Sequence, residues 1–247
     1  MAPRVPIDLH IHTALSPCAA AEMKPAEILL TAERAGLAVV GLVDHGSAGN
    51  AGAALRAAPA FEPRVLVGIE AESTEGVHLL ALFDTLEAVA DLETVLAAHM
   101  PDLPNRPKVL GEQQLVDEWG EVRGVEDRLL VTATDLGVEE IADLTRARGG
   151  LCIPAHIDRS VNGLLPLLGF LPPRLEVDLL EVSSALTPEQ ARERWPELAG
   201  RALVTGSDAH CLQDVGRAVT WIPPEFAQAD LEPKKWGEAV ARELLRA

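Results

Sequence analysis

The segment Ile7-Asp8-Leu9-His10-Ile11-His12 decides the fold of this chain. Apolar and polar residues alternate along it, which is the period of a half-buried β-strand. In a strand the side chains of His10 and His12 project from the same face, because successive residues point to opposite faces. Two imidazoles placed in this way can bind one metal ion, or they can be ordinary polar residues at a strand end. The rest of the chain decides between these two interpretations.

Short apolar runs alternate with longer helical patterns along the whole chain. This alternation is typical of βα units around a largely parallel sheet. Proline begins the helical pattern at Pro25 and glycine ends it at Gly36, as expected for helix ends. We predict strands at residues 5–11, 37–43, 65–69, 77–83, 151–154, 179–182, 202–205 and 218–222. We predict helices at residues 25–35, 85–99, 138–148 and 233–246, and a surface helix or turn over 48–60.

The chain length suits a single barrel. The 247 residues are 48% hydrophobic, which is enough for a sizeable core, and the length matches that of an α/β barrel. Residues 100–137 depart from the pattern, because three prolines cluster at their start and polar residues dominate 112–127. This segment is either a solvated connection with one short helix or a lid that selects the substrate. We therefore predict one domain over 1–247, with an insertion at 100–137.

Composition excludes several classes of protein. Lys and Arg number 21 against 38 Asp and Glu, a formal charge of −17, which argues against long duplex nucleic acid as a partner. Aromatic residues make up 3% with no tyrosine, so little is available to stack single strands. Three cysteines cannot form a disulfide framework, and no apolar run is long enough for a signal peptide or a membrane span. We expect a cytoplasmic protein with no membrane partner.

Six of the seven histidines lie on or beside predicted strands, together with carboxylates, and only His99 does not. Most of these positions are the C-terminal ends of strands, where the active sites of α/β barrels assemble. Nitrogen and carboxylate ligands with almost no nearby thiol suit Mn²⁺, Zn²⁺ or Fe²⁺. The motifs after the first strand are Asp44-His45, Gly68-Ile69-Glu70, Val77-His78, Ala155-His156 and Ser207-Asp208-Ala209-His210.

The ordered succession of these motifs, over residues 5–217, resembles the PHP family, the polymerase and histidinol phosphatase group of metal-dependent phosphoesterases. The resemblance implies an α/β fold, a distorted (βα)7 TIM-like barrel. It also implies two to three divalent metal ions, up to a trinuclear centre, and hydrolysis of phosphate esters. It assigns the first metal to His10, His12, Glu70 and Asp208, with Glu70 bridging to a second metal held by His78 and His156. His45 and His210 resemble ligands of the third.

The third site departs from the family pattern. Cys18 stands near the place where an Asp or His is usual, so this site takes a thiolate, a water or no metal, or Cys18 is a small packing residue. The matching subgroup keeps Ser-Pro-Cys here but has Asn where this chain has Gly46, which removes a contact either to substrate or to a side chain that holds a ligand. His78 is either a ligand or an imidazole buried within its strand.

Other charged residues near these motifs have two interpretations each. Asp8 and Asp44 fit carboxylates that fix the tautomer of a ligand histidine, or they are surface charges. Glu181 positions a ligand or forms a strand-end salt bridge. Glu72 and Glu75 are solvated loop charges or neighbours of the site. Arg159 holds two phosphate oxygens with its planar fork, or it pairs with Asp158 or Glu181. Arg217 is a second candidate for substrate binding.

The predicted activity is hydrolysis of a small phosphomonoester by a metal-activated water, with Glu70, Asp208 and Arg159 as catalytic residues. The expected substrates are a nucleotide, a nucleoside bisphosphate or a molecule like histidinol phosphate. Three alternatives remain: an exonuclease acting on short oligonucleotides, a noncatalytic metal-binding regulator, and a hydrolase of amides or lactones.

Overall fold

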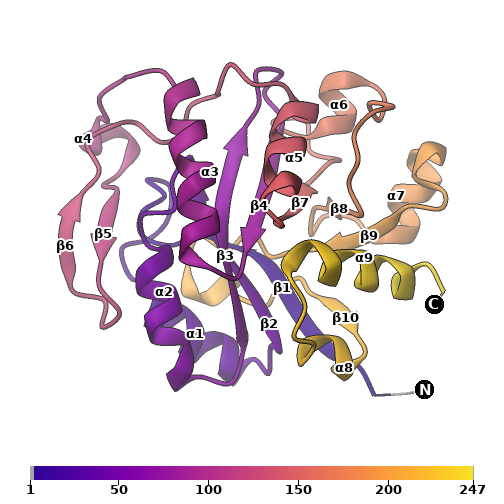
Figure 1. Ribbon diagram of the computed structural model, residues 1–247, viewed down its shortest axis with the longest axis horizontal. Coiled ribbons are helices and arrows are strands. Elements are labelled where there is room, and N and C mark those ends of the chain that lie inside the picture. Colours follow the sequence, from indigo (N-terminus) through magenta and orange to yellow (C-terminus); the bar gives the residue numbers. More distant parts are fainter. Residues whose placement is uncertain (1–2, 247) are drawn as a thin grey trace.

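The computed structural model describes residues 3–246 and shows a curled β-sheet flanked by helices (Figure 1). Each predicted strand is present, within three residues of its expected ends. The strands of the barrel and its edge are β1 (Val5–Ile11), β2 (Val39–His45), β3 (Arg64–Glu72), β4 (His78–Phe83), β7 (Leu151–Pro154), β8 (Leu179–Val182), β9 (Ala202–Thr205) and β10 (Thr220–Ile222). Six of them pair in the order β10-β1-β2-β3-β4-β7, and β8 pairs with β9.

Backbone hydrogen bonds at the strand ends close the sheet into a distorted barrel of seven strands. Between the ends of β7 and β8, the Ile157 N–H donates to Glu181 O at 2.8 Å. Between the end of β1 and the residues after β9, the His12 N–H donates to Ala209 O at 3.0 Å. These bonds complete the circle β1, β2, β3, β4, β7, β8, β9, which confirms the predicted α/β fold.

The sheet is largely parallel, as predicted, with two antiparallel exceptions, β4 and β10. Strands β1, β2 and β3 run parallel, whereas β3 with β4, β4 with β7 and β1 with β10 are antiparallel. The cause is a tight hairpin after β3, in which the Ser73 N–H donates to Val77 O at 2.8 Å and Gly76 takes a φ of 82°. A hairpin this short joins only antiparallel strands. The start of β4 therefore lies at the same rim as the C-terminal ends of β1 to β3.

The four predicted helices are present as α1 (Pro25–Arg34), α3 (Leu86–His99), α5 (Val138–Ala147) and α9 (Pro233–Leu244). The alanine-rich stretch forms α2 (Ala51–Ala57) and a 3₁₀ turn, as predicted. Helix α4 (Pro107–Leu110) is a short helix of the kind that one interpretation of residues 100–137 expected. The short helices α6 (Leu164–Leu168), α7 (Pro188–Arg194) and α8 (Pro224–Ala227) were not predicted, because segments this short show no helical periodicity. Within residues 3–246, no helix has both the length and the apolar character that crossing a membrane requires.

The hydrophobic core lies on both sides of the sheet, below the rim that carries the polar motifs. Helices α1, α2, α3 and α5 bury their apolar faces against its outer face, and Trp236 of α9 packs with the residues inside the barrel. Strand β2 is buried along its whole length, as is typical of a strand covered on both faces. The residues of the rim are thus held by tightly packed strands.

Residues 100–137 contain α4 and an unpredicted hairpin of β5 (Gln114–Val116) and β6 (Val122–Val125), which lies beside α2 in Figure 1. Buried Gln113 ties the segment together, because its Nε2 donates to Glu126 O at 2.7 Å and its Oε1 accepts from the Leu130 N–H at 3.0 Å. Asn50 fixes it to the barrel, donating to Gln114 O at 3.0 Å and accepting from the Val116 N–H at 2.9 Å. The hairpin is thereby bonded to the loop after β2.

Candidate metal centre

The structure brings the predicted ligands together at one rim of the barrel. The HxH pair comes from the end of β1 and the residue after it, and further ligands come from the ends of β2 and β3. One lies at the start of the antiparallel β4, and the others follow β7 and β9. The side chains that meet there are His10, His12, His45, Glu70, His78, His156, Asp208 and His210.

Glu70 lies at the centre of the cluster and is 2% exposed. Its Oε1 is 2.8 Å from His78 Nδ1 and 3.2 Å from His156 Nε2. Its Oε2 is 3.0 Å from His45 Nδ1 and 3.3 Å from His12 Nε2. Within residues 3–246, this buried Oε2 has no partner in hydrogen-bonding geometry despite those short distances. A buried carboxylate oxygen facing imidazole nitrogens without bonding them fits a position that bridges metal ions.

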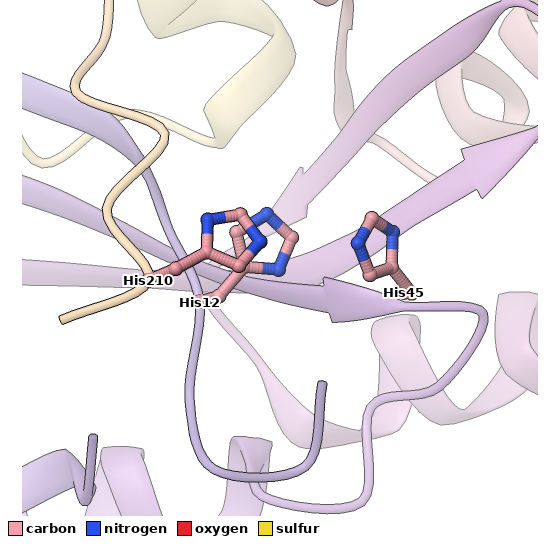
Figure 2. A group of neighbouring side chains, drawn as sticks. All are labelled: His12, His45 and His210. Carbon is pink, nitrogen blue, oxygen red and sulfur yellow. The ribbon is translucent and has the colours of Figure 1, made fainter. Parts of the chain in front are cut away.

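The donor atoms form three overlapping groups within this cluster. In each group one ligand atom from every member lies within 4.8 Å of the others. The ring centroids of His12 and His210 are 4.1 Å apart. Figure 2 shows these two rings one over the other, with His45 beside them. The three groups are His10 with His12 and Asp208, His12 with His45 and His210, and His45 with Glu70 and His78. Several donor groups sharing members fit more than one divalent ion.

The grouping differs in part from the one that the family resemblance implied. His45 and His210 share a group, as expected, but His12 joins them, and His45 also stands with Glu70 and His78. His78 reaches the cluster because β4 is antiparallel, so the first residue of that strand is at the rim. His99 lies apart, as predicted, and pairs with Asp135 at 2.6 Å.

Glu181 orients the ring of His10. His10 Nδ1 lies 3.0 Å and 3.2 Å from the two oxygens of Glu181, which is 2% exposed. An ionised carboxylate only accepts, so Nδ1 carries the hydrogen and Nε2 turns its lone pair toward the cluster. Glu181 also accepts from the His156 N–H at 3.1 Å. Of its two predicted roles, the contacts favour that of positioning ligands.

Ser16 orients His12 and was missed by the sequence reasoning. Its hydroxyl donates to Asp44 Oδ1 at 2.7 Å and accepts from the backbone N–H of His45 at 3.2 Å. His12 Nδ1 lies 2.9 Å from the same oxygen, so Nδ1 donates and Nε2 is left to face the cluster. Asp44 thus acts on His12 through Ser16 and does not contact the neighbouring imidazole of His45 directly.

Asp8 contacts backbone, so the expectation that it fixes an imidazole tautomer is wrong. It accepts from the N–H groups of Ser207 and Gly216, both at 3.0 Å, and joins β1 to the loop after β9. Burial raises the pKa of Asp8 to about 6. Glu75 accepts from the Val138 N–H at the start of α5, whereas Glu72 lies 3.8 Å from His78 Nε2.

The charges of the cluster shift the pKa values of its members strongly. Burial by itself raises the pKa of Glu70, but the charges of His78, His10 and His45 hold it well below its ordinary value. Burial opposes protonation of His78, yet the charge of Glu70 raises its pKa to about 9. Glu70 is therefore ionised, which is the state in which a carboxylate binds metal.

Two residues of the cluster have strained backbone conformations. His156 and Asp208 take φ values of 31° and 51°, in the left-handed region that side chains other than glycine rarely adopt. Such conformations cost roughly 1–3 kcal/mol each and cluster at functional sites. Nearby Asn162, with a φ of 61°, accepts the His78 N–H at 3.1 Å through its carbonyl and so holds the start of β4.

The two arginines predicted to bind phosphate lie at different distances from the cluster. Arg159 Nη1 lies 2.6 Å from Asp208 Oδ2, and its side chain is half exposed beside the cluster. Neither predicted ion pair of Arg159 forms, since Asp158 instead accepts from the Ser183 hydroxyl at 2.6 Å. Arg217 pairs with Asp214 on the surface and is not brought to the cluster.

Cys18 and Gly46, the two departures from the family pattern at the third predicted site, both lie near the cluster. Cys18 is exposed and its thiol contacts the His45 side chain, but it belongs to none of the three donor groups. Gly46 has a φ of 58°, and a Cβ there would stand 2.7 Å from Leu130 O and from the Met100 side chain. The segment 100–137 thus fills the space that an asparagine side chain at position 46 would need.

Comparisons with known proteins identify the fold that carries this cluster. Residues 191–232 match the PHP-associated family model, and no curated protein sequence matches the chain. The lesion-specific endonuclease PfuEndoQ from Pyrococcus furiosus is 21% identical with a TM-score of 0.65, over 87% of this chain and 51% of that one. The chain thus spans about half of that endonuclease.

Two further structures match over most of both chains. A protein described as a metal-dependent phosphoesterase, from Bifidobacterium adolescentis, is 18% identical with a TM-score of 0.59, covering 85% of this chain and 89% of that one. An amidohydrolase from Chromobacterium violaceum is 21% identical with a TM-score of 0.59, covering 88% and 92%. The chain therefore has the fold of the PHP metal-dependent phosphoesterases.

Proposed function

We propose that this protein is a hydrolase that uses divalent metal ions to cleave a small phosphomonoester. The observation that carries the proposal is Glu70, whose buried Oε2 faces imidazole nitrogens from two strands without a hydrogen bond to either. Residues from the ends of six strands meet around it. The ligands we propose are the eight side chains of the cluster, with Cys18 beside His45 as a ninth candidate.

Divalent ions bound in this cluster would supply a water of lowered pKa and positive charge opposite the phosphate oxygens. The chain itself contributes orientation and charge. Glu181 and Ser16 hold the imidazoles of His10 and His12 with Nε2 turned inward. Arg159, paired with Asp208 through Nη1, offers the rest of its guanidinium fork to the phosphate. Because these groups are held before substrate binds, they stabilise the developing charge at little reorganisation cost.

Size and charge support a small substrate. A cavity of about 260 Å³ adjoins the cluster and is lined by Arg159 and Asp208 among others. The formal charge of −17 repels long polyanions, so only a positive metal centre would draw a phosphate to this rim. A small phosphorylated molecule is the partner we propose.

The test is phosphate release by protein loaded in turn with Mn²⁺, Zn²⁺ and Fe²⁺, across a panel of phosphomonoesters that includes nucleotides and sugar phosphates. We expect turnover that chelation abolishes. A protein that binds metal and releases no phosphate from any ester would contradict the proposal and favour a regulator. Faster turnover of amides or lactones than of phosphate esters would favour carbon-centred hydrolysis, the chemistry that the name of the Chromobacterium neighbour suggests.

A second candidate function is a nuclease acting on short DNA. It is favoured by the likeness to the lesion-specific endonuclease, half of whose chain has this fold. Against it, the chain has a formal charge of −17 and carries no tyrosine for stacking. End-labelled oligonucleotides, intact and with an abasic site, belong in the same panel. Cleavage at kcat/KM above that of every monoester would make the nuclease the better assignment.

A further inference from the structure

A small cavity adjoins the metal-binding cluster on the side of β7, β8 and β9. It has a volume of about 260 Å³. The loops that follow these three strands line it with His156, Arg159, Ser183, Ser184, Ser207 and Asp208. Because Asp208 and His156 belong to both the cluster and the cavity, a phosphate held at the cluster would place its esterified group there.

The walls of this cavity are polar and offer unused hydrogen-bonding groups. Ser184 is exposed, and its hydroxyl makes no hydrogen bond within residues 3–246. Arg159 uses Nη1 on Asp208, which leaves the other nitrogens of its fork to a ligand. The Ser183 hydroxyl donates its hydrogen to Asp158, so toward a ligand its oxygen can only accept. These groups match hydroxyls on a bound molecule.

The cavity also lacks what a nucleobase needs. Among the described residues that line it, none is Phe or Trp, and base recognition usually relies on stacking against such rings. Its volume is below the roughly 300–1,000 Å³ of pockets that enclose drug-sized ligands. A fused aromatic base would have to project out of the cavity without a planar surface to contact.

We infer that this cavity receives the esterified group of the substrate and selects a small hydroxylated one, so that the substrate class is sugar or polyol monophosphates. This inference rests on the proposed phosphomonoester hydrolysis. Ser184 is its specificity-determining residue, and Arg159 spans the phosphate and the cavity. Nucleotides are the poorer substrates, because their base finds no partner there.

Ribose 5-phosphate and AMP test the inference, because they share the ribosyl 5-phosphate and differ by the adenine. We expect kcat/KM for ribose 5-phosphate to exceed that for AMP at least tenfold in the metal-loaded protein. Equal values, or a preference for AMP, overturn the inference while leaving phosphomonoester hydrolysis in place. No release from any phosphate ester overturns the proposed function, and the inference with it.

Two variants at position 184 distinguish the effect of the hydroxyl group from the effect of the cavity volume. Ser184→Ala removes only the free hydroxyl and should lower kcat/KM for ribose 5-phosphate about fivefold to tenfold. Ser184→Leu fills the cavity and should lower kcat/KM for ribose 5-phosphate further. In both variants the loss for methyl phosphate, which carries no hydroxylated group, should be smaller. Position 184 is exposed, so both variants should fold, which thermal melting checks. An equal loss for methyl phosphate, or no loss for ribose 5-phosphate, contradicts the assignment.

Discussion

The hydroxyl of Ser16 makes three hydrogen bonds, to His12, to Asp44 and to the backbone of His45. One donor and two acceptor positions are all that a serine has, so its capacity is fully used. The bonds connect a carboxylate on β2 with an imidazole that follows β1. The arrangement makes the orientation of His12 depend on a residue that is not a ligand.

Ser16→Ala should lower the affinity for Zn²⁺ about 10–100-fold, which is the usual effect of removing the partner of a ligand histidine. The reason is that His12 Nδ1 loses its acceptor and the ring is free to turn. Competitive zinc titration measures the change. Thr145→Val, which removes a buried hydroxyl from α5, is the matched control and should leave affinity unchanged. Equal affinities in Ser16→Ala and the wild type would show that Ser16 does not position His12.

Cys152 predicts a pH dependence of stability. Burial in β7 raises the pKa of its thiol to about 12 from an ordinary 9.0, so the folded state retains a proton that the unfolded state loses. Stability from this group is complete below pH 9 and is lost as pH rises toward 12. Between pH 8 and pH 11 the free energy of unfolding should fall by about 2–3 kcal/mol more than in Cys152→Ala. Parallel pH profiles for the two proteins would contradict this.

At this scale the sequence predicted the ligands better than the residues that hold them. The candidate ligands sit in short motifs at strand ends, and the structure brings eight of them, including His78, into one cluster. Ser16 acts through neighbours that are distant in sequence, and no local pattern marks it. Asp8 was misassigned because adjacency to His10 in sequence does not show that its carboxylate turns toward backbone N–H groups.

The hairpin of β3 and β4 is the element that completes the cluster. It brings Glu70 and His78 to the same rim, with Glu72 opposite His78 in the register of the two strands. The strands approach closely at Gly68, where a Cβ would stand 2.1 Å from Ala81 O. Glycine is required there because β4 occupies the space of a side chain.

Gly68→Ala should destabilise the protein by about 3 kcal/mol, since the added methyl group forces the two strands apart. It should also weaken metal binding, because the same displacement separates Glu70 from His78. Thermal melting and zinc titration measure the two effects. Gly124→Ala in β6 is the control, because its Cβ would meet nothing closer than 4.0 Å. Equal melting temperatures for the two variants would refute the tight approach at Gly68.

The positions of the strands could be predicted, whereas the antiparallel directions of β4 and β10 could not. Apolar runs with β-branched residues revealed all eight strands of the barrel and its edge. The antiparallel course of β4 depends on the five-residue connection Ser73-Thr74-Glu75-Gly76-Val77, which the βα pattern did not distinguish from a loop leading to a helix. The hairpin in residues 100–137 was not predicted, because its strands have only three and four residues and most of their side chains are exposed.

The whole molecule carries a large negative charge, and the rim concentrates ionised carboxylates among histidines. Bound cations would neutralise part of that charge and bind only to the folded state. Metal removal should therefore lower the melting temperature. The loss corresponds to about 2.7 kcal/mol at a free metal concentration one hundred times Kd. Melting with and without chelator measures it, and Glu70→Gln should show a much smaller response. An identical response in both proteins would place the metal elsewhere.

Phosphate release by the metal-loaded protein is the decisive measurement of whether this cluster is catalytic, with Asp208→Asn compared against Asp214→Asn. The two variants make the same change six residues apart, and only Asp208 belongs to the cluster, whereas Asp214 pairs with Arg217. We predict metal-dependent release in the wild type and Asp214→Asn, with a loss of at least a hundredfold in Asp208→Asn. Equal release by both variants, or release that chelation leaves intact, would contradict the assignment of this cluster as the catalytic metal centre.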